Sequence, residues 1–212
     1  MAEISRLIAT QGKRIIFIED FESIYHHTNA NLASGALLKR QADLSLFGNS
    51  ALALSHPLGV TGSSTLSWNV PGNPVRLKRI SITILFLVDT LNTTLTLRYQ
   101  ENERTRITTY GIKIQPSQNL WYFLNRAGTW EALPQITTQL TYKKWYTIEM
   151  TIDTREQKII SLRINLEQFK INKYVYTGIV TNFSTWASYD VAFENTIENK
   201  AIVLDHIIIE EA

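Results

Sequence analysis

The sequence predicts an all-β protein folded as one antiparallel two-sheet β-sandwich, or jelly roll. A dozen or so short segments alternate apolar and polar residues, with turn residues between them at regular spacing. The composition is rich in Val, Ile, Thr, Tyr and Trp, which favour strands, and no segment has a convincing helical period. No linker or shift in composition divides the 212 residues. We therefore expect a single domain over residues 1–212, with residues 1–14 as an N-terminal arm or first edge strand.

The clearest strand pattern lies between Lys143 and Phe169. The even positions from Tyr146 to Ile152 are apolar, while the odd positions between them are polar. A charged turn at 153–158 follows, and then Ile160, Leu162, Ile164 and Leu166 again place apolar residues at even positions. This alternation predicts a hairpin of two half-buried strands with one face in the core.

The other predicted strands follow from the same alternation and from the breakers between them. Residues 79–88 form the longest apolar segment and are predicted to be a central strand. The Pro-Gly-Asn-Pro sequence at 71–74 ends the strand before it. Residues 23–43 are interrupted by Asn, Thr and Gly, so we expect a loop with strand fragments there. The remaining strands are expected at 14–22, 48–55, 65–70, 94–100, 104–115, 120–125, 130–133, 174–180, 189–194 and 201–210.

Charge and composition exclude several classes of function. The formal charge is only +2 and the basic residues are scattered, which disfavours a nucleic-acid partner. The absence of cysteine excludes disulfides, thiolate zinc sites and a cysteine nucleophile. No apolar run is long enough for a signal peptide or a membrane span, so we expect a soluble protein. It would be cytosolic, virion-associated, or extracellular after loss of a leader.

Four short motifs resemble those of concanavalin A-like and laminin G-like jelly rolls and of related carbohydrate-binding modules. They are F-I-E-D-F-E-S at 17–23, G-N-S-A-L-A-L at 48–54, W-Y-T-I-E-M-T-I-D at 145–153 and I-V-L-D-H-I-I-I-E at 202–210. In these families the opening strand lies beside the closing strand. The resemblance implies the fold more directly than the function.

The resemblance also implies a structural calcium ion, held by Glu22, Asp205 and Asp43. Asp205 shares one face of the predicted strand with Val203, Ile207 and Ile209, and a carboxylate on that apolar face needs a partner. The alternative is that Asp205 pairs with a basic side chain or accepts hydrogen bonds from the backbone.

A polysaccharide hydrolase of this architecture would carry three acidic residues at positions i, i+2 and i+4 of one strand. The nearest match is Glu149, Thr151 and Asp153, where threonine replaces the middle carboxylate. The pattern therefore favours a role without catalysis, and a hydrolase or lyase is the third hypothesis.

Aromatic residues are the better candidates for binding, because their flat faces stack on sugar rings and anchor protein interfaces. Trp130 and Trp186 lie near predicted loops, and Trp121 and Tyr122 point to opposite faces of one strand. The sequence thus favours a non-catalytic recognition module that binds a glycan. The alternative is a structural or interaction protein of a virus or phage particle, whose partner would be another protein or further copies of this chain.

Overall fold

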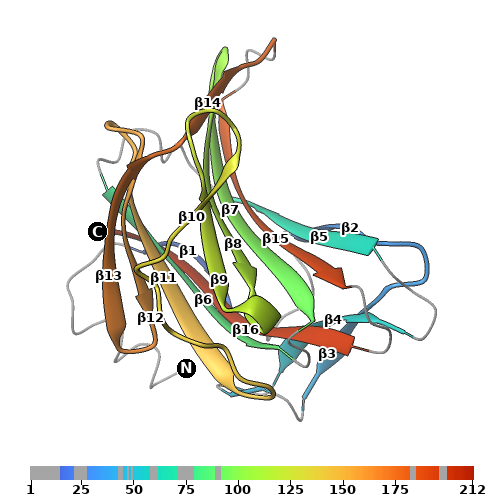
Figure 1. Cartoon of the computed structure of the whole chain (residues 1–212). Helices are drawn as coiled ribbons and strands as arrows, with labels where there is room; N and C mark the ends of the chain where they lie inside the picture. The colour runs from blue at the N-terminus through green and yellow to red at the C-terminus, as the bar shows by residue number, and fades with distance from the viewer. Residues whose placement is uncertain are drawn as a thin grey trace.

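The structure is a computed structural model that describes residues 15–21, 28–42, 45–46, 48, 50–57, 62–70, 79–88, 92–181, 185–195 and 200–212. Within them the chain forms two antiparallel eight-stranded sheets, which pack face to face (Figure 1). This confirms the predicted all-β sandwich. Among the described residues, no helix has the length and apolar composition needed to cross a lipid bilayer.

Sheet A contains the predicted hairpin and the closing strand. Its order is β13 (Glu167–Tyr174), β12 (Lys158–Ile164), β11 (Trp145–Asp153), β6 (Arg79–Val88), β16 (Lys200–Glu211), β4 (Ala51–His56) and β3 (Leu37–Gln41). The opening strand β1 (Ile15–Glu19) also pairs with β16, as the resemblance implied.

Sheet B is the second layer of the sandwich. Its order is β10 (Trp130–Ala132), β9 (Leu120–Leu124), β8 (Arg106–Gln115), β7 (Thr93–Glu103), β15 (Trp186–Asn195), β5 (Gly62–Asn69) and β2 (Thr28–Asn31). The short strand β14 (Tyr176–Ile179) pairs with β8. Strands β2 and β3 are the fragments expected within residues 23–43.

The structure contains the predicted hairpin as β11–β12, and it confirms the predicted turn and the predicted first strand. In β12 a register shift opposite Thr151 and Ile152 places Ile159 in the core, and Ile160 is only half-buried. Leu166 lies in the turn after β12 and is 98% exposed, so the prediction that it faces the core was wrong. Alternation could not predict these two positions, because a bulge and a turn each interrupt the period of two.

The core lies between the two sheets and is rich in large aromatic side chains. Among the largest fully buried are Trp68, Trp121, Tyr99, Tyr110 and Tyr189. Trp68 packs edge-on against Phe21 at 6.2 Å between ring centroids, and it also lies 6.3 Å from Tyr189. These side chains join β5 and β15 of sheet B to the segment that follows β1.

The closing strand β16 contains a second register shift, between Leu204 and His206. Before it Leu204 faces the main core, and after it Ile207 and Ile209 do so. Val203 belongs instead to a small cluster with Ala51 and Ala53. The predicted common face of Val203, Ile207 and Ile209 was therefore wrong, because the shift changes which residues point inward.

Candidate functional site

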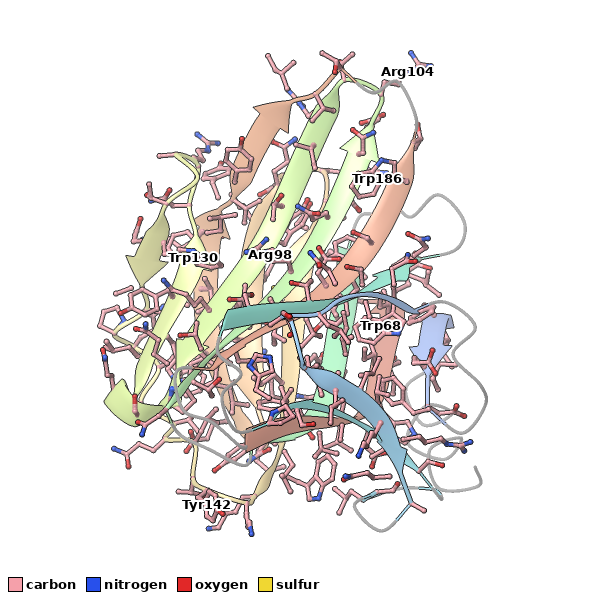
Figure 2. The ribbon with its side chains drawn as sticks, turned by 90° about the vertical axis from the view of Figure 1, so that its right-hand side faces the viewer. Trp68, Arg98, Arg104, Trp130, Tyr142 and Trp186 are labelled. Atoms are coloured by element: carbon pink, nitrogen blue, oxygen red, sulfur yellow. The ribbon has the colours of Figure 1, made fainter. Side chains whose placement is uncertain are left out.

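The candidate site lies on the face of sheet B that points away from sheet A, here called the outer face. On β7, Leu95, Leu97 and Tyr99 are buried in the core, so Arg98 and its alternate neighbours take the outer face. Figure 2 looks onto this face, with Arg98 near its centre. The outer face is therefore built by the residues that alternate with the core positions of the strands of sheet B.

Two aromatic rings and a lysine occupy adjacent strands at one side of the outer face. Lys113 of β8 pairs with Tyr122 of β9, and Tyr122 pairs with Ala132 of β10, the strand that carries Trp130. The Lys113 Nζ lies 4.6 Å from the centroid of the Tyr122 ring and 5.0 Å from that of the Trp130 ring. Both distances are within the range of a cation–π contact, so Lys113 helps to fix both rings. We call Lys113, Tyr122 and Trp130 the aromatic–lysine cluster.

Gly111 of β8 allows the Trp130 indole to lie against the strand backbone. A Cβ atom at this position would be 3.2 Å from the Trp130 Cη2 and 3.2 Å from the Leu124 Cβ. Glycine in a strand often marks such a close approach. The position of the Trp130 indole therefore depends on the absence of a Cβ atom at Gly111 as well as on Lys113.

An arginine and an aspartate lie next to this cluster, nearer the middle of the sheet. Arg98 of β7 pairs with Gly111 on one side and with Asp190 of β15 on the other. Burial raises the pKa of Asp190, and hydrogen bonds from Ser67 and Ser188 together with the Arg98 charge act in the opposite direction. The Nε of Arg98 is buried and has no hydrogen-bond partner among the described residues.

Small polar residues lie next to Arg98 and Asp190. The Gln100 Nε2 donates to the Thr109 Oγ1 at 3.1 Å, and Thr109 and Ser188 are buried although they face away from the core. The outer face thus offers aromatic rings at one side and hydroxyl, amide and charged groups beside them. Such a combination suits a ligand that has flat apolar faces and polar edges, as a sugar does.

The structure brings two of the four predicted aromatic residues together. Tyr122 and Trp130 belong to the same cluster, whereas Trp186 lies at the start of β15, opposite Asn102. It is four positions from Asp190 along the strand, roughly 13 Å at about 3.3 Å per residue. Figure 2 shows Trp186 apart from Trp130 on the same sheet.

Trp121 is not available to a ligand, which corrects its prediction as a binding residue. It is 2% exposed, and its Nε1 donates a hydrogen bond to the Thr138 carbonyl at 3.2 Å. The alternation of β9 sends Trp121 into the core and Tyr122 to the outer face.

The predicted calcium ligands are only partly within the described structure, because Glu22 and Asp43 lie outside it. Asp205 is fully buried and accepts hydrogen bonds from the Ser45 Oγ at 3.3 Å and the Leu46 backbone N–H at 2.8 Å. The His206 Nδ1 lies 3.0 Å from the Asp205 Oδ1. The described residues include no group of three or more metal-ligating side chains, and calcium binding stays a prediction.

The three positions that match the hydrolase pattern lie on sheet A and make structural contacts. Glu149 forms an ion pair with Arg163 of the next strand. Thr151 contacts the Ser81 hydroxyl at 3.4 Å. Asp153 accepts hydrogen bonds from two backbone N–H groups of the β11–β12 turn, at 3.1 Å and 2.9 Å.

Sequence reasoning missed Lys113, Arg98 and Asp190. Each alternates with buried apolar residues of its own strand, which indicates an outward position. Arg98 and Lys113 lie on the consecutive paired strands β7 and β8, whereas Asp190 reaches Arg98 only because β15 pairs with β7, a strand far from it in the sequence. Alternation could have placed each side chain on a face, but not beside the others.

No family model and no curated protein matches this chain. Several solved structures resemble it in fold at low sequence identity. An endo-β-1,4-glucuronan lyase from the fungus Trichoderma reesei is 9% identical with a TM-score of 0.64, and the match covers 93% of this chain and 96% of the lyase. A carbohydrate esterase from the Shiga toxin-encoding bacteriophage phi24B is 14% identical with a TM-score of 0.61, and the match covers 94% and 99% of the two chains.

Peanut lectin is 8% identical with a TM-score of 0.60, and the match covers 92% of this chain and 96% of the lectin. At such identities the likeness concerns the fold alone. It shows that the chain has the concanavalin A-like jelly-roll fold that its motifs predicted.

Proposed function

We propose that this concanavalin A-like sandwich is a non-catalytic recognition module that binds a glycan on the outer face of sheet B. The observation that carries the proposal is the aromatic–lysine cluster, in which the Lys113 ammonium lies 4.6 Å and 5.0 Å from two aromatic rings. Rings held in place in this way lose little conformational entropy when a ligand binds. The polar groups around Arg98 and Asp190 supply hydrogen bonds beside them.

The fold comparison supports the same proposal, because a lectin shares this architecture. The lyase and the esterase have the fold as well, so the fold by itself does not separate binding from catalysis. The contacts of Glu149 and Asp153 favour binding, since both carboxylates are engaged in an ion pair or a turn. The proposal therefore depends on the outer face, where the exposed parts of the rings lie.

We expect Trp130→Ala and Tyr122→Ala each to weaken glycan binding about tenfold or more, because each removes a stacking surface. A glycan array identifies the ligand, and calorimetry then measures its dissociation constant. Tyr142→Ala is the matched control. Tyr142 is an aromatic residue that is 48% exposed, and Figure 2 shows it at the lower end of the molecule, away from Trp130 and Arg98. The Tyr142→Ala variant should leave the affinity unchanged.

Trp186→Ala distinguishes the cluster from a second aromatic site on the same sheet. A loss of affinity in this variant alone, with normal binding by the Trp130 and Tyr122 variants, would contradict the assignment. Failure of the wild-type protein to bind any glycan, together with a symmetric assembly in solution, would favour the structural role in a particle instead.

Gly111→Ala tests the same site without removing an aromatic ring. The new Cβ would lie 3.2 Å from the Trp130 Cη2, so the indole must shift by a few tenths of an ångström or more. We expect the affinity to fall several-fold while thermal unfolding shows a folded protein. Unchanged affinity would mean that the position of the Trp130 ring does not matter to binding.

A further inference from the structure

We infer that the glycan bound at the outer face carries negatively charged groups, as a uronate or a sulfated sugar does. This inference rests on the proposed function and adds the chemical class of the ligand. It comes from Arg98 and Lys113, two basic residues beside the aromatic rings, and from the environment of Asp190, the acidic residue described next to Arg98.

Basic groups outnumber acidic groups among the described side chains on this part of the outer face. Among the outward side chains that the structure describes on the adjacent strands β10, β9, β8, β7 and β15, two are basic, Arg98 and Lys113, and one is acidic, Asp190. Burial raises the pKa of Asp190, so its environment disfavours the charged form relative to an aspartate in water. The field at the aromatic–lysine cluster is therefore positive, which attracts an anionic ligand.

Arg98 has hydrogen-bonding capacity that the described residues do not use. Asp190 receives hydrogen bonds from Ser67 and Ser188, and the buried Arg98 Nε has no hydrogen-bond partner among the described residues. A buried donor without a partner costs free energy, and a ligand oxygen would recover part of it. The planar guanidinium group matches the two oxygens of a carboxylate or sulfate better than a lysine ammonium does.

The position of Arg98 relative to the rings suits a charged substituent on a stacked sugar. Arg98 pairs with Gly111, and the Trp130 indole lies against Gly111. The backbone of β7 lies about one strand spacing, roughly 5 Å, from the β8 backbone that the indole covers. Lys113 lies diagonally across from Arg98 on the neighbouring strand, where such pairs are roughly 7–8 Å apart. A ring stacked on Trp130 would have a cation on each of two sides.

The test compares two pairs of polymers that differ in charge. Polygalacturonate is compared with its methyl ester, and dextran sulfate with dextran, by affinity electrophoresis and calorimetry on the full chain. We expect binding to a charged member of a pair and at least tenfold weaker binding to its uncharged counterpart. Affinity should also fall steeply between about 0.01 M and about 1 M NaCl, as the screening length drops from about 30 Å to about 3 Å.

Three variants assign the effect to residues. Arg98→Gln should weaken binding of the charged polymer about tenfold or more. Arg98→Lys should weaken it less, because lysine keeps the positive charge but lacks the planar guanidinium group that binds two oxygens at once. Lys113→Gln is a second variant that keeps the inference testable if Arg98→Gln fails to fold. Lys39→Gln on β3 of sheet A is the matched control, because it removes an exposed basic residue from the other sheet.

The outcomes separate this inference from the proposed function. Preference for polygalacturonate supports a carboxylate, and preference for dextran sulfate supports a sulfate. Binding of uncharged glycans with no gain from charge, or equal losses in Lys39→Gln and Arg98→Gln, would overturn the inference and leave the proposed function standing. Failure to bind every polymer and every glycan of an array would overturn both.

Discussion

Raising the pH from about 4.5 to above 7 should lower the free energy of unfolding by about 3 kcal/mol, through the buried carboxyl group of Glu101. Glu101 is 4% exposed, and its Oε1 accepts a hydrogen bond from the Tyr99 hydroxyl at 3.2 Å. Burial raises the pKa of Glu101 from 4.5 to about 7, although the hydrogen bond from Tyr99 lowers it in part and the charge of Glu103 raises it further. The neutral acid is thus the favoured form inside the sandwich.

The sign follows from proton binding in the two states. Between pH 4.5 and pH 7 the folded protein keeps a proton on Glu101 that the unfolded chain has released. The folded state binds more protons in this window, so its stability falls as the pH rises. The contribution is fully present below the unfolded value and is lost once the pH passes the folded value.

Urea unfolding at a series of pH values measures this effect. In the Glu101→Gln variant the fall in the free energy of unfolding between pH 4.5 and pH 7 should disappear, because the glutamine amide does not titrate. Glu131→Gln is the control, since Glu131 is exposed and lies on the short strand β10. A slope that persists unchanged in Glu101→Gln would show that another group is responsible.

Trp121→Ala should destabilise the fold by about 3–5 kcal/mol, the usual cost of removing a large aromatic side chain from a core. Trp121 is 2% exposed, and its indole N–H is bonded to the Thr138 carbonyl, so the substitution leaves a cavity and an unpaired acceptor. Trp130→Ala should cost about 1 kcal/mol, because Trp130 is only half-buried on the outer face. Chemical denaturation of the two variants, with the wild type, measures both values.

This pair of substitutions separates a core role from a binding role. Trp121→Ala should change stability far more than Trp130→Ala, whereas only Trp130→Ala should reduce glycan affinity in the folded protein. Equal destabilisation by the two variants would place Trp130 in the core and remove the basis for the aromatic–lysine cluster. Tyr122→Ala provides a third comparison, since Tyr122 and Trp121 are neighbours in the sequence and lie on opposite faces of β9.

The strands and their buried faces could be predicted from the sequence, because alternation with a period of two is a local property of the chain. Tyr146, Ile148, Met150 and Ile152 are all in the core, as their even spacing indicated. The opposite orientations of Trp121 and Tyr122 followed from the same rule. Strand β13 escaped prediction because Ile171 is the single buried position of this edge strand and leaves little alternation to detect.

The site itself was decided only by the tertiary structure. Arg98, Asp190 and Gly111 come together because β15 pairs with β7 and β7 pairs with β8, and local patterns do not reveal which distant strands become neighbours. The register shifts in β12 and β16 likewise depend on the partner strands, and they moved Ile160 and Val203 from the faces that alternation had predicted. The sequence by itself thus determined most of the strands and, between bulges, which side of each of them is buried. The order of the strands determined which outward side chains could act together, because pairs such as β15 with β7 form between strands that are remote in the chain.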